Sequence, residues 1–90
     1  ALDGQLQGGA PVLSRTVAAW TQESTVATTL GAVEKAHDGV QIGSYPFWRE
    51  GRTGANFVIR ATDPAQLETV ALALMAGLRD IGIDPIDGEL

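Results

Sequence analysis

One stretch of the sequence decides the fold, and it reads Ile42-Gly43-Ser44-Tyr45-Pro46-Phe47-Trp48-Arg49-Glu50-Gly51-Arg52-Thr53-Gly54-Ala55-Asn56-Phe57-Val58-Ile59-Arg60. Apolar strand patterns at its two ends flank a loop that holds three of the five aromatic residues of the chain. A loop that only reverses the chain direction rarely needs so much bulk and charge. We therefore expect this loop to pack against something or to bind something.

Two strands are predicted on either side of the loop. Residues 40–45 alternate between apolar and polar or small side chains, and Pro46 is expected to end that strand because it removes a ladder donor. Residues 55–62 form the next strand, whose alternate positions place one apolar set on a single face: Phe57, Ile59 and Ala61. The glycines between them, Gly51 and Gly54, predict a hairpin tip with positive φ angles.

The remaining elements follow from changes in the period of the apolar residues. Residues 12–20 suit a strand, and from about Ser24 a helical period begins that Asp38-Gly39 ends. The last helix runs from a cap at Asp63, with Gln66 close to a capping-box position. Its apolar stripe is Leu67, Val70, Ala71, Leu74, Met75, Leu78 and Ile81. Ile83 to Ile86 add at most a short edge strand.

This order predicts an α+β fold, a two-layer sandwich with a small antiparallel or mixed sheet and both helices on one face (βαββα, with a short last strand as an option). The other sheet face is expected to carry Tyr45, Asn56, Val58 and Arg60, with Trp20 or its neighbours. The outer side of the last helix is also weakly charged, at Thr69, Leu72, Ala73 and Ala76. Either surface is suited to contact another domain or subunit.

Composition limits the function classes. Ninety residues make one small domain, which we place at residues 12–90 after a linker or frayed arm at residues 1–11. No cysteine is present and His37 is the single histidine, so a zinc site is not expected. The net charge of −5 disfavours nucleic acid, and no apolar run predicts a membrane span. The chain begins without Met, which indicates a piece of a longer protein.

A resemblance enters at the same stretch. The string from Ile42 to Phe47, then an arginine, a glycine and a strand that ends in Arg60 and Asp63-Pro64, resembles the segment after the molybdopterin-binding-like domain of the competence/damage-inducible protein A family. It is similar also to the matching region of eukaryotic FAD synthases. The earlier Glu23-Ser24 before an apolar helix fits the pattern, and the resemblance covers residues 12–81.

The resemblance implies a KH-like or ferredoxin-like accessory domain that follows an upstream domain of the same chain. It implies a cytoplasmic parent, bacterial in character, in which the upstream domain carries any molybdopterin or nucleotide and any pyrophosphatase activity. That domain's phosphate loop and acidic metal-binding positions do not occur here. No catalytic residue, metal ligand or cofactor is therefore expected in this chain.

Six residues are candidates for ligand or interface contact: Ser44, Tyr45, Trp48, Arg49, Arg52 and Arg60. Ser44 and Tyr45 are suited to closing a pocket on the upstream domain, or else they simply end a strand. The arginines are suited to phosphate, or else they pair with Glu50, Asp63 or acids of the missing domain. Trp48 either anchors an interface or packs over its own sheet.

Other signals have mainly structural interpretations. Gly51-Arg52-Thr53-Gly54 matches the Gly-x-x-Gly clamp of RNA-binding KH domains in its letters, but that clamp joins two helices and this one joins two strands. His37 suits a structural role near a helix C-terminus. Glu23 and Glu68 lack the spacing of a catalytic carboxylate pair.

The function expected from these observations is a non-catalytic accessory domain that docks onto its upstream domain, forms a homodimer, or does both. Two alternatives stay open. In one, Tyr45 and Arg49 complete the active site of an upstream nucleotide pyrophosphatase or transferase. In the other, the chain is a KH-like RNA-binding module.

Overall fold

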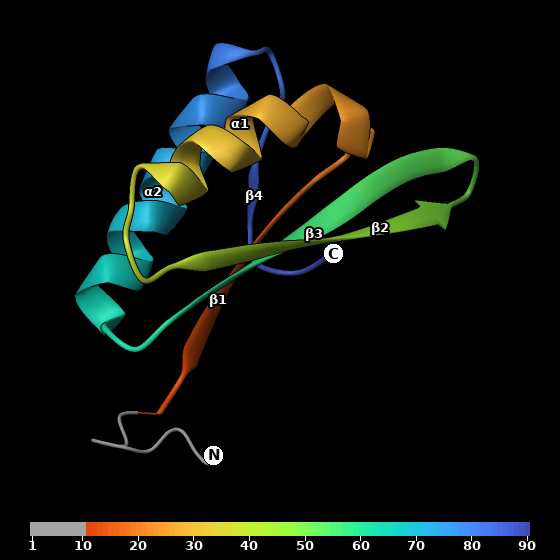
Figure 1. Cartoon of the computed structure of the whole chain (residues 1–90). Helices are drawn as coiled ribbons and strands as arrows, with labels where there is room; N and C mark the ends of the chain where they lie inside the picture. Colours follow the sequence, from red (N-terminus) through yellow and green to blue (C-terminus); the bar gives the residue numbers. More distant parts are fainter. Residues whose placement is uncertain (1–10) are drawn as a thin grey trace.

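The computed structural model describes residues 11–90, which form an antiparallel sheet with two helices packed on one of its faces (Figure 1). The elements in chain order are β1 (Leu13–Ala19), α1 (Glu23–Lys35), β2 (Gln41–Arg49), β3 (Arg52–Ala61), α2 (Pro64–Asp80) and β4 (Ile86–Asp87). The four strands are ordered β2-β3-β1-β4, and every pairing is antiparallel. This is the split βαβ, or ferredoxin-like, arrangement. The predicted fold class is confirmed, and the short last strand forms. The linker predicted at residues 1–11 lies, apart from Pro11, outside the described residues.

The hairpin of β2 and β3 is longer than the sequence predicted, because Pro46 does not end β2. β2 is an edge strand, and the backbone N–H of Ile42 donates to Glu34 Oε2 of α1 (2.8 Å) instead of to the sheet. Residues four apart in a strand point their backbone groups to the same side. The missing N–H of Pro46 therefore lies on the outer edge, where no ladder bond is lost.

A two-residue turn closes this hairpin. Glu50 and Gly51 both have positive φ (52° and 76°), as expected of the turns whose twist matches that of paired strands. Arg49 and Arg52 face each other across the last pair of the ladder. Gly54 lies within β3, so the predicted hairpin tip is confirmed at Gly51 and is wrong at Gly54.

The core lies between the sheet and α2. The predicted apolar face of β3 is buried, and so is the apolar stripe of α2 from Leu67 through Leu78. The fully buried large side chains are Phe57, Ile59, Leu74, Leu78, Val17, Val26 and Val70. Ile81 was predicted to belong to the stripe, but it follows the last helical residue, Asp80, and is 45% exposed.

The two helices meet at a glycine. A Cβ at Gly77 of α2 would lie 2.8 Å from Thr29 Cγ2 of α1, so the absence of a side chain there allows the close approach. α1 begins at Glu23 after Gln22, whose side chain makes no capping bond. Near its end, His37 Nδ1 lies 2.8 Å from the carbonyl oxygen of Val33, in agreement with the structural role predicted for this histidine.

The start of α2 is capped as predicted by Asp63. Its Oδ1 accepts a hydrogen bond from the backbone N–H of Ala65 (3.0 Å), and Pro64 occupies the first turn. The capping box does not form, because Gln66 Nε2 donates instead to the carbonyl oxygen of Asp38 (2.8 Å). Gln66 thus ties α2 to the loop that precedes β2.

Arg15 braces three elements on the helix side of the sheet. From β1, its Nε and Nη2 donate to the two carboxylate oxygens of Glu68 on α2, each at 3.2 Å, and its Nη1 donates to Asp87 on β4. The hydrogen bond from Arg15 holds the pKa of Asp87 below its ordinary value. The sequence reasoning did not identify this brace, because its residues are 53 and 72 positions apart.

Candidate functional site: the hairpin and the open face of the sheet

The hairpin presents different side chains on its two sides. In an antiparallel pair, opposite residues share a face and alternate residues change face. Phe57 of β3 lies under the helices, and Thr53, four residues before it, shares its face. Trp48 pairs with Thr53, so Trp48 also points to the helix side. Phe47, which pairs with Gly54, points to the face that no helix covers, which we call the open face. The tip of the hairpin extends beyond the helices (Figure 1).

Four side chains pack together on the open face near the hairpin tip, and we call them the arginine–aromatic cluster: Trp20, Phe47, Arg49 and Arg52. The rings of Trp20 and Phe47 meet edge to face, with centroids 5.3 Å apart and planes at 79°. Arg49 Cζ lies 4.6 Å from the Phe47 centroid, and Arg52 Cζ lies 4.1 Å from the Trp20 centroid. Each aromatic ring therefore carries one guanidinium group.

Gly54 makes this packing possible. A Cβ at Gly54 would lie 2.5 Å from Phe47 Cζ, closer than real Cβ atoms come to a neighbour, and it would make a tight contact with Trp20 Cε3 at 3.1 Å. The absence of a side chain at Gly54 thus leaves the space in which the two rings meet. Phe47 was predicted to lie in a loop, but it belongs to β2, packs locally and is only partly exposed. The sequence reasoning missed its contact with Trp20, which required the register of β1 against β3.

The charges of the cluster are not neutralised within residues 11–90. There the ion pairs all involve Arg15, and no carboxylate lies within pairing distance of Arg49 or Arg52. The pairing with Glu50 or Asp63, predicted as the ordinary structural role of these arginines, does not form. Their guanidinium groups also make no hydrogen bond to other residues of this part of the chain.

Tyr45 and Arg60 form a second contact on the open face. Arg60 Nη1 lies 3.4 Å from Tyr45 Oη, at the long end of a hydrogen bond, and the tyrosine is half exposed. A Cβ at Gly43 would lie 3.1 Å from both Cε2 and Oη of Tyr45. The ring of Tyr45 therefore lies closely over Gly43, and a Cβ there would make a tight contact with it.

Ser44 and Trp48 lie on the helix side of β2. Ser44 pairs with the buried Phe57, and its Oγ is buried with no hydrogen-bond partner within the described residues. Trp48 is 73% exposed, so its local packing over the sheet, one of its two predicted roles, does not occur. The six candidate residues therefore do not form one site.

The comparisons with known proteins give the family. The model of the family described as "FAD synthase, middle domain" matches residues 11–87. The chain belongs to this family. No curated protein matches the chain. Among solved structures, "De novo designed protein Foldit4" is similar, with a TM-score of 0.61 and 13% sequence identity over 88% of this chain and 96% of that chain. That likeness shows the fold alone.

These findings confirm one half of the predicted resemblance. The similarity to FAD synthases, read from the stretch around Tyr45, is confirmed by the family match. The similarity to the competence/damage-inducible protein A family and to molybdopterin-binding proteins stays a prediction. In residues 11–90 of this family member, neither helix is long and apolar enough to cross a membrane.

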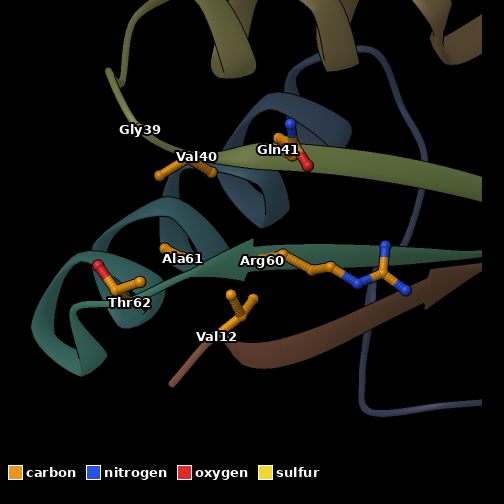
Figure 2. Close-up of a pocket in the computed structure, with 7 residues that line it drawn as sticks. All are labelled: Val12, Gly39, Val40, Gln41, Arg60, Ala61 and Thr62. Carbon is orange, nitrogen blue, oxygen red and sulfur yellow. The ribbon is translucent and has the colours of Figure 1, made fainter. Parts of the chain in front are cut away.

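A pocket of about 430 Å³ lies at the opposite end of the sheet from the hairpin tip. Its lining residues are Val12, Gly39, Val40, Gln41, Arg60, Ala61 and Thr62. Figure 2 shows the side chain of Arg60 running along the strand, with its guanidinium group away from Val12 and Thr62. This pocket of the FAD synthase middle domain therefore has mostly apolar walls, and the guanidinium group of Arg60 extends away from Val12 and Thr62.

The centre of the open face is covered by the residues that follow β4. The side chain of Asn56 bonds both main-chain groups of Leu90, since its Oδ1 accepts from the N–H (2.9 Å) and its Nδ2 donates to the carbonyl oxygen (3.4 Å). Asn56 stands between Gly54 and Val58 on this face. The segment at Leu90 therefore lies over Asn56, beside the arginine–aromatic cluster.

Proposed function

We propose that this chain is a non-catalytic accessory domain that contacts another folded unit through the β2–β3 hairpin. The partner is the upstream molybdopterin-binding-like domain of the same protein, or a second copy of the chain. The family's description as a middle domain supports a setting with neighbouring domains. The resemblance around Ser44-Tyr45-Pro46 supports the choice of the upstream partner.

The exposure of Trp48 carries this proposal. At 73%, it has the highest exposed fraction of the large hydrophobic side chains in the described part of the chain. A tryptophan exposes a large apolar area, and central tryptophans are among the strongest anchors of protein interfaces. Trp48 is the penultimate residue of β2, and the hairpin tip extends beyond the helices (Figure 1).

The contact is expected to use side chains and not strand addition. Four residues of β2 direct their backbone groups to the outer edge: Ile42, Ser44, Pro46 and Trp48. The N–H of Ile42 is occupied by Glu34, and Pro46 has none. An edge blocked at two of four positions is a poor template for another strand. The exposed side chain of Trp48 thus remains the main means of recognition.

The alternative in which Tyr45 and Arg49 together complete an upstream active site has less support. Both point to the open face of β2, but they are four residues apart, or roughly 13 Å at about 3.3 Å per residue. Arg49 is stacked on Phe47 and Tyr45 is directed back toward Arg60. The two side chains therefore contact different neighbours and do not converge on one point.

The test measures association of the Trp48→Ala variant. Sedimentation of the chain alone over a concentration series reports dimerisation, and titration with the separate upstream domain reports docking. Loss of a central interface tryptophan typically costs about 2 kcal/mol or more, which weakens association roughly thirtyfold. Ile81→Ala, at a 45% exposed position after α2 and outside the surfaces suited to contact, is the matched control. Association that Trp48→Ala leaves unchanged in both assays contradicts the proposal.

A further inference from the structure

We propose that the arginine–aromatic cluster is a binding site for a small ligand that carries a phosphate group. In this site, Arg49 and Arg52 donate hydrogen bonds to the phosphate, and Phe47 and Trp20 hold the two guanidinium groups in place. The cluster lies on the opposite side of the hairpin from Trp48. The proposal therefore goes beyond the docking function and does not depend on it.

The two guanidinium groups are already positioned for a ligand. Each is stacked over an aromatic ring, at 4.6 Å for Arg49 and 4.1 Å for Arg52. Stacking fixes the plane of a guanidinium while its N–H groups, which lie at the edge, stay available to donate. Within residues 11–90 none of these N–H groups has an acceptor. Little rotamer entropy is then lost when a ligand binds.

The placement of the two charges is unfavourable without a ligand. Arg49 and Arg52 are directly opposite each other in the ladder, and like charges in this position destabilise a strand pair. The chain has a net charge of −5, so acidic residues are abundant, and Glu50 lies between the two arginines. None of them forms an ion pair here in the described structure. A bound anion would remove the repulsion.

A phosphate fits the pair better than a carboxylate does. One guanidinium satisfies a carboxylate by a two-bond fork, whereas a terminal phosphate has three oxygens and close to two negative charges. It can therefore accept from both arginines together. A nucleic-acid strand is disfavoured, because the net charge repels a long polyanion and the segment at Leu90 covers the face beside the cluster.

The experiment is an NMR titration of the 90-residue chain that follows the Nε–H signals of Arg49 and Arg52 and the indole N–H of Trp20. The probes are inorganic phosphate, pyrophosphate and ADP, with a glutamate-rich peptide and an RNA oligonucleotide for comparison. We expect saturable shifts for pyrophosphate, with a dissociation constant of about 1 mM or lower. Equal affinity for pyrophosphate and ADP assigns the site to the phosphates alone, and tighter ADP binding assigns it to a nucleotide.

Single substitutions test the assignment to the cluster. Arg49→Gln and Arg52→Gln are each expected to weaken pyrophosphate binding about tenfold or more, because each removes a charge-assisted pair of hydrogen bonds. Arg79→Gln, on α2, is the matched control and should leave the affinity unchanged. Arg49→Lys keeps the charge but loses the fork, and is expected to weaken binding severalfold.

Several results would overturn this inference. They are the absence of saturation by any phosphate compound, equal weakening by Arg79→Gln, full affinity in Arg49→Lys, or tighter binding of the peptide or the RNA. Circular dichroism of each variant verifies the fold. If a glutamine variant unfolds, the pyrophosphate affinity of Arg49→Lys, which keeps the charge, decides whether the arginine binds the phosphate.

Discussion

The two halves of the β2–β3 hairpin share one hydrogen-bonded ladder, but they are stabilised differently. Near Phe57 and Ile59 the hairpin is covered by α2, and these two inner side chains of β3 are fully buried. Near the tip, the packing comes from Phe47 and Trp20 with the arginines, on the face that the helices do not cover. The half under α2 is stabilised by burial of apolar side chains, whereas the half at the tip is stabilised by contacts between side chains on the open face. A surface used for recognition is therefore expected at the tip.

The largest expected effect tests the buried half. Leu74 is fully buried in the stripe of α2, so Leu74→Ala should lower the free energy of unfolding by about 2–5 kcal/mol. Urea and thermal melts measure it. Leu72→Ala, two residues away and 57% exposed, should change stability by no more than about 0.5 kcal/mol. Similar losses in both variants would contradict the assignment of the core.

The second effect tests the packing of the tip. Gly54→Ala places a Cβ where Phe47 and Trp20 meet, and this overpacking should cost about 1–3 kcal/mol. Near-UV circular dichroism should lose the signal of the Trp20–Phe47 contact. Gly31→Ala in α1 is the control, because a Cβ there meets nothing within 4 Å and should favour the helix by up to about 1 kcal/mol. A stable Gly54→Ala variant with an unchanged spectrum would show that the rings do not pack as described.

The third effect concerns pH. The pKa of Asp87 is lower in the folded chain than in the unfolded chain because Arg15 donates to its carboxylate. Such a group stabilises the fold above the ordinary aspartate pKa of about 3.9, and this contribution disappears as pH falls through the lowered folded pKa. Asp87→Asn should therefore flatten the dependence of the melting temperature on pH in the acid range. Asp84→Asn serves for comparison, and the same flattening there would rule out the brace as its source.

The smallest expected effect tests the exposed side chain at the hairpin tip. Trp48→Ala should change the free energy of unfolding by no more than about 0.5 kcal/mol, because the side chain is mostly exposed. A melt of the isolated chain measures it. A loss near that of Leu74→Ala would mean that Trp48 belongs to the core, and docking through it would have to be abandoned.

The sequence predicted the regular elements well because their signals are local. The period of α2 identified its buried face, and the alternation around Phe57 and Ile59 identified the inner face of β3. The extension of β2 past Pro46 could not be predicted, because it depends on which strand lies at the edge. The first and last strands were placed within a few residues of their observed positions.

The candidate site was predicted only as a set of residues. The loop with its aromatic and arginine side chains was identified, but Trp20 was not placed against Phe47, since 27 positions separate them and only the register of β1 on β3 brings them together. For the same reason the sequence did not separate Trp48 from Arg49. Their opposite directions follow from the strand geometry that replaced the predicted loop.

The brace at Arg15 has a consequence for how the sheet assembles. The central strand β1 ends in a run of small and apolar residues, Val17-Ala18-Ala19, which by themselves distinguish poorly between alternative alignments with β3. A shift of β1 by one residue would move Arg15 to the open face, away from both Glu68 and Asp87. Misaligned strands would thus leave two carboxylates without their partner. Arg15 thereby favours the correct register of β1 against β3 over registers shifted by one residue.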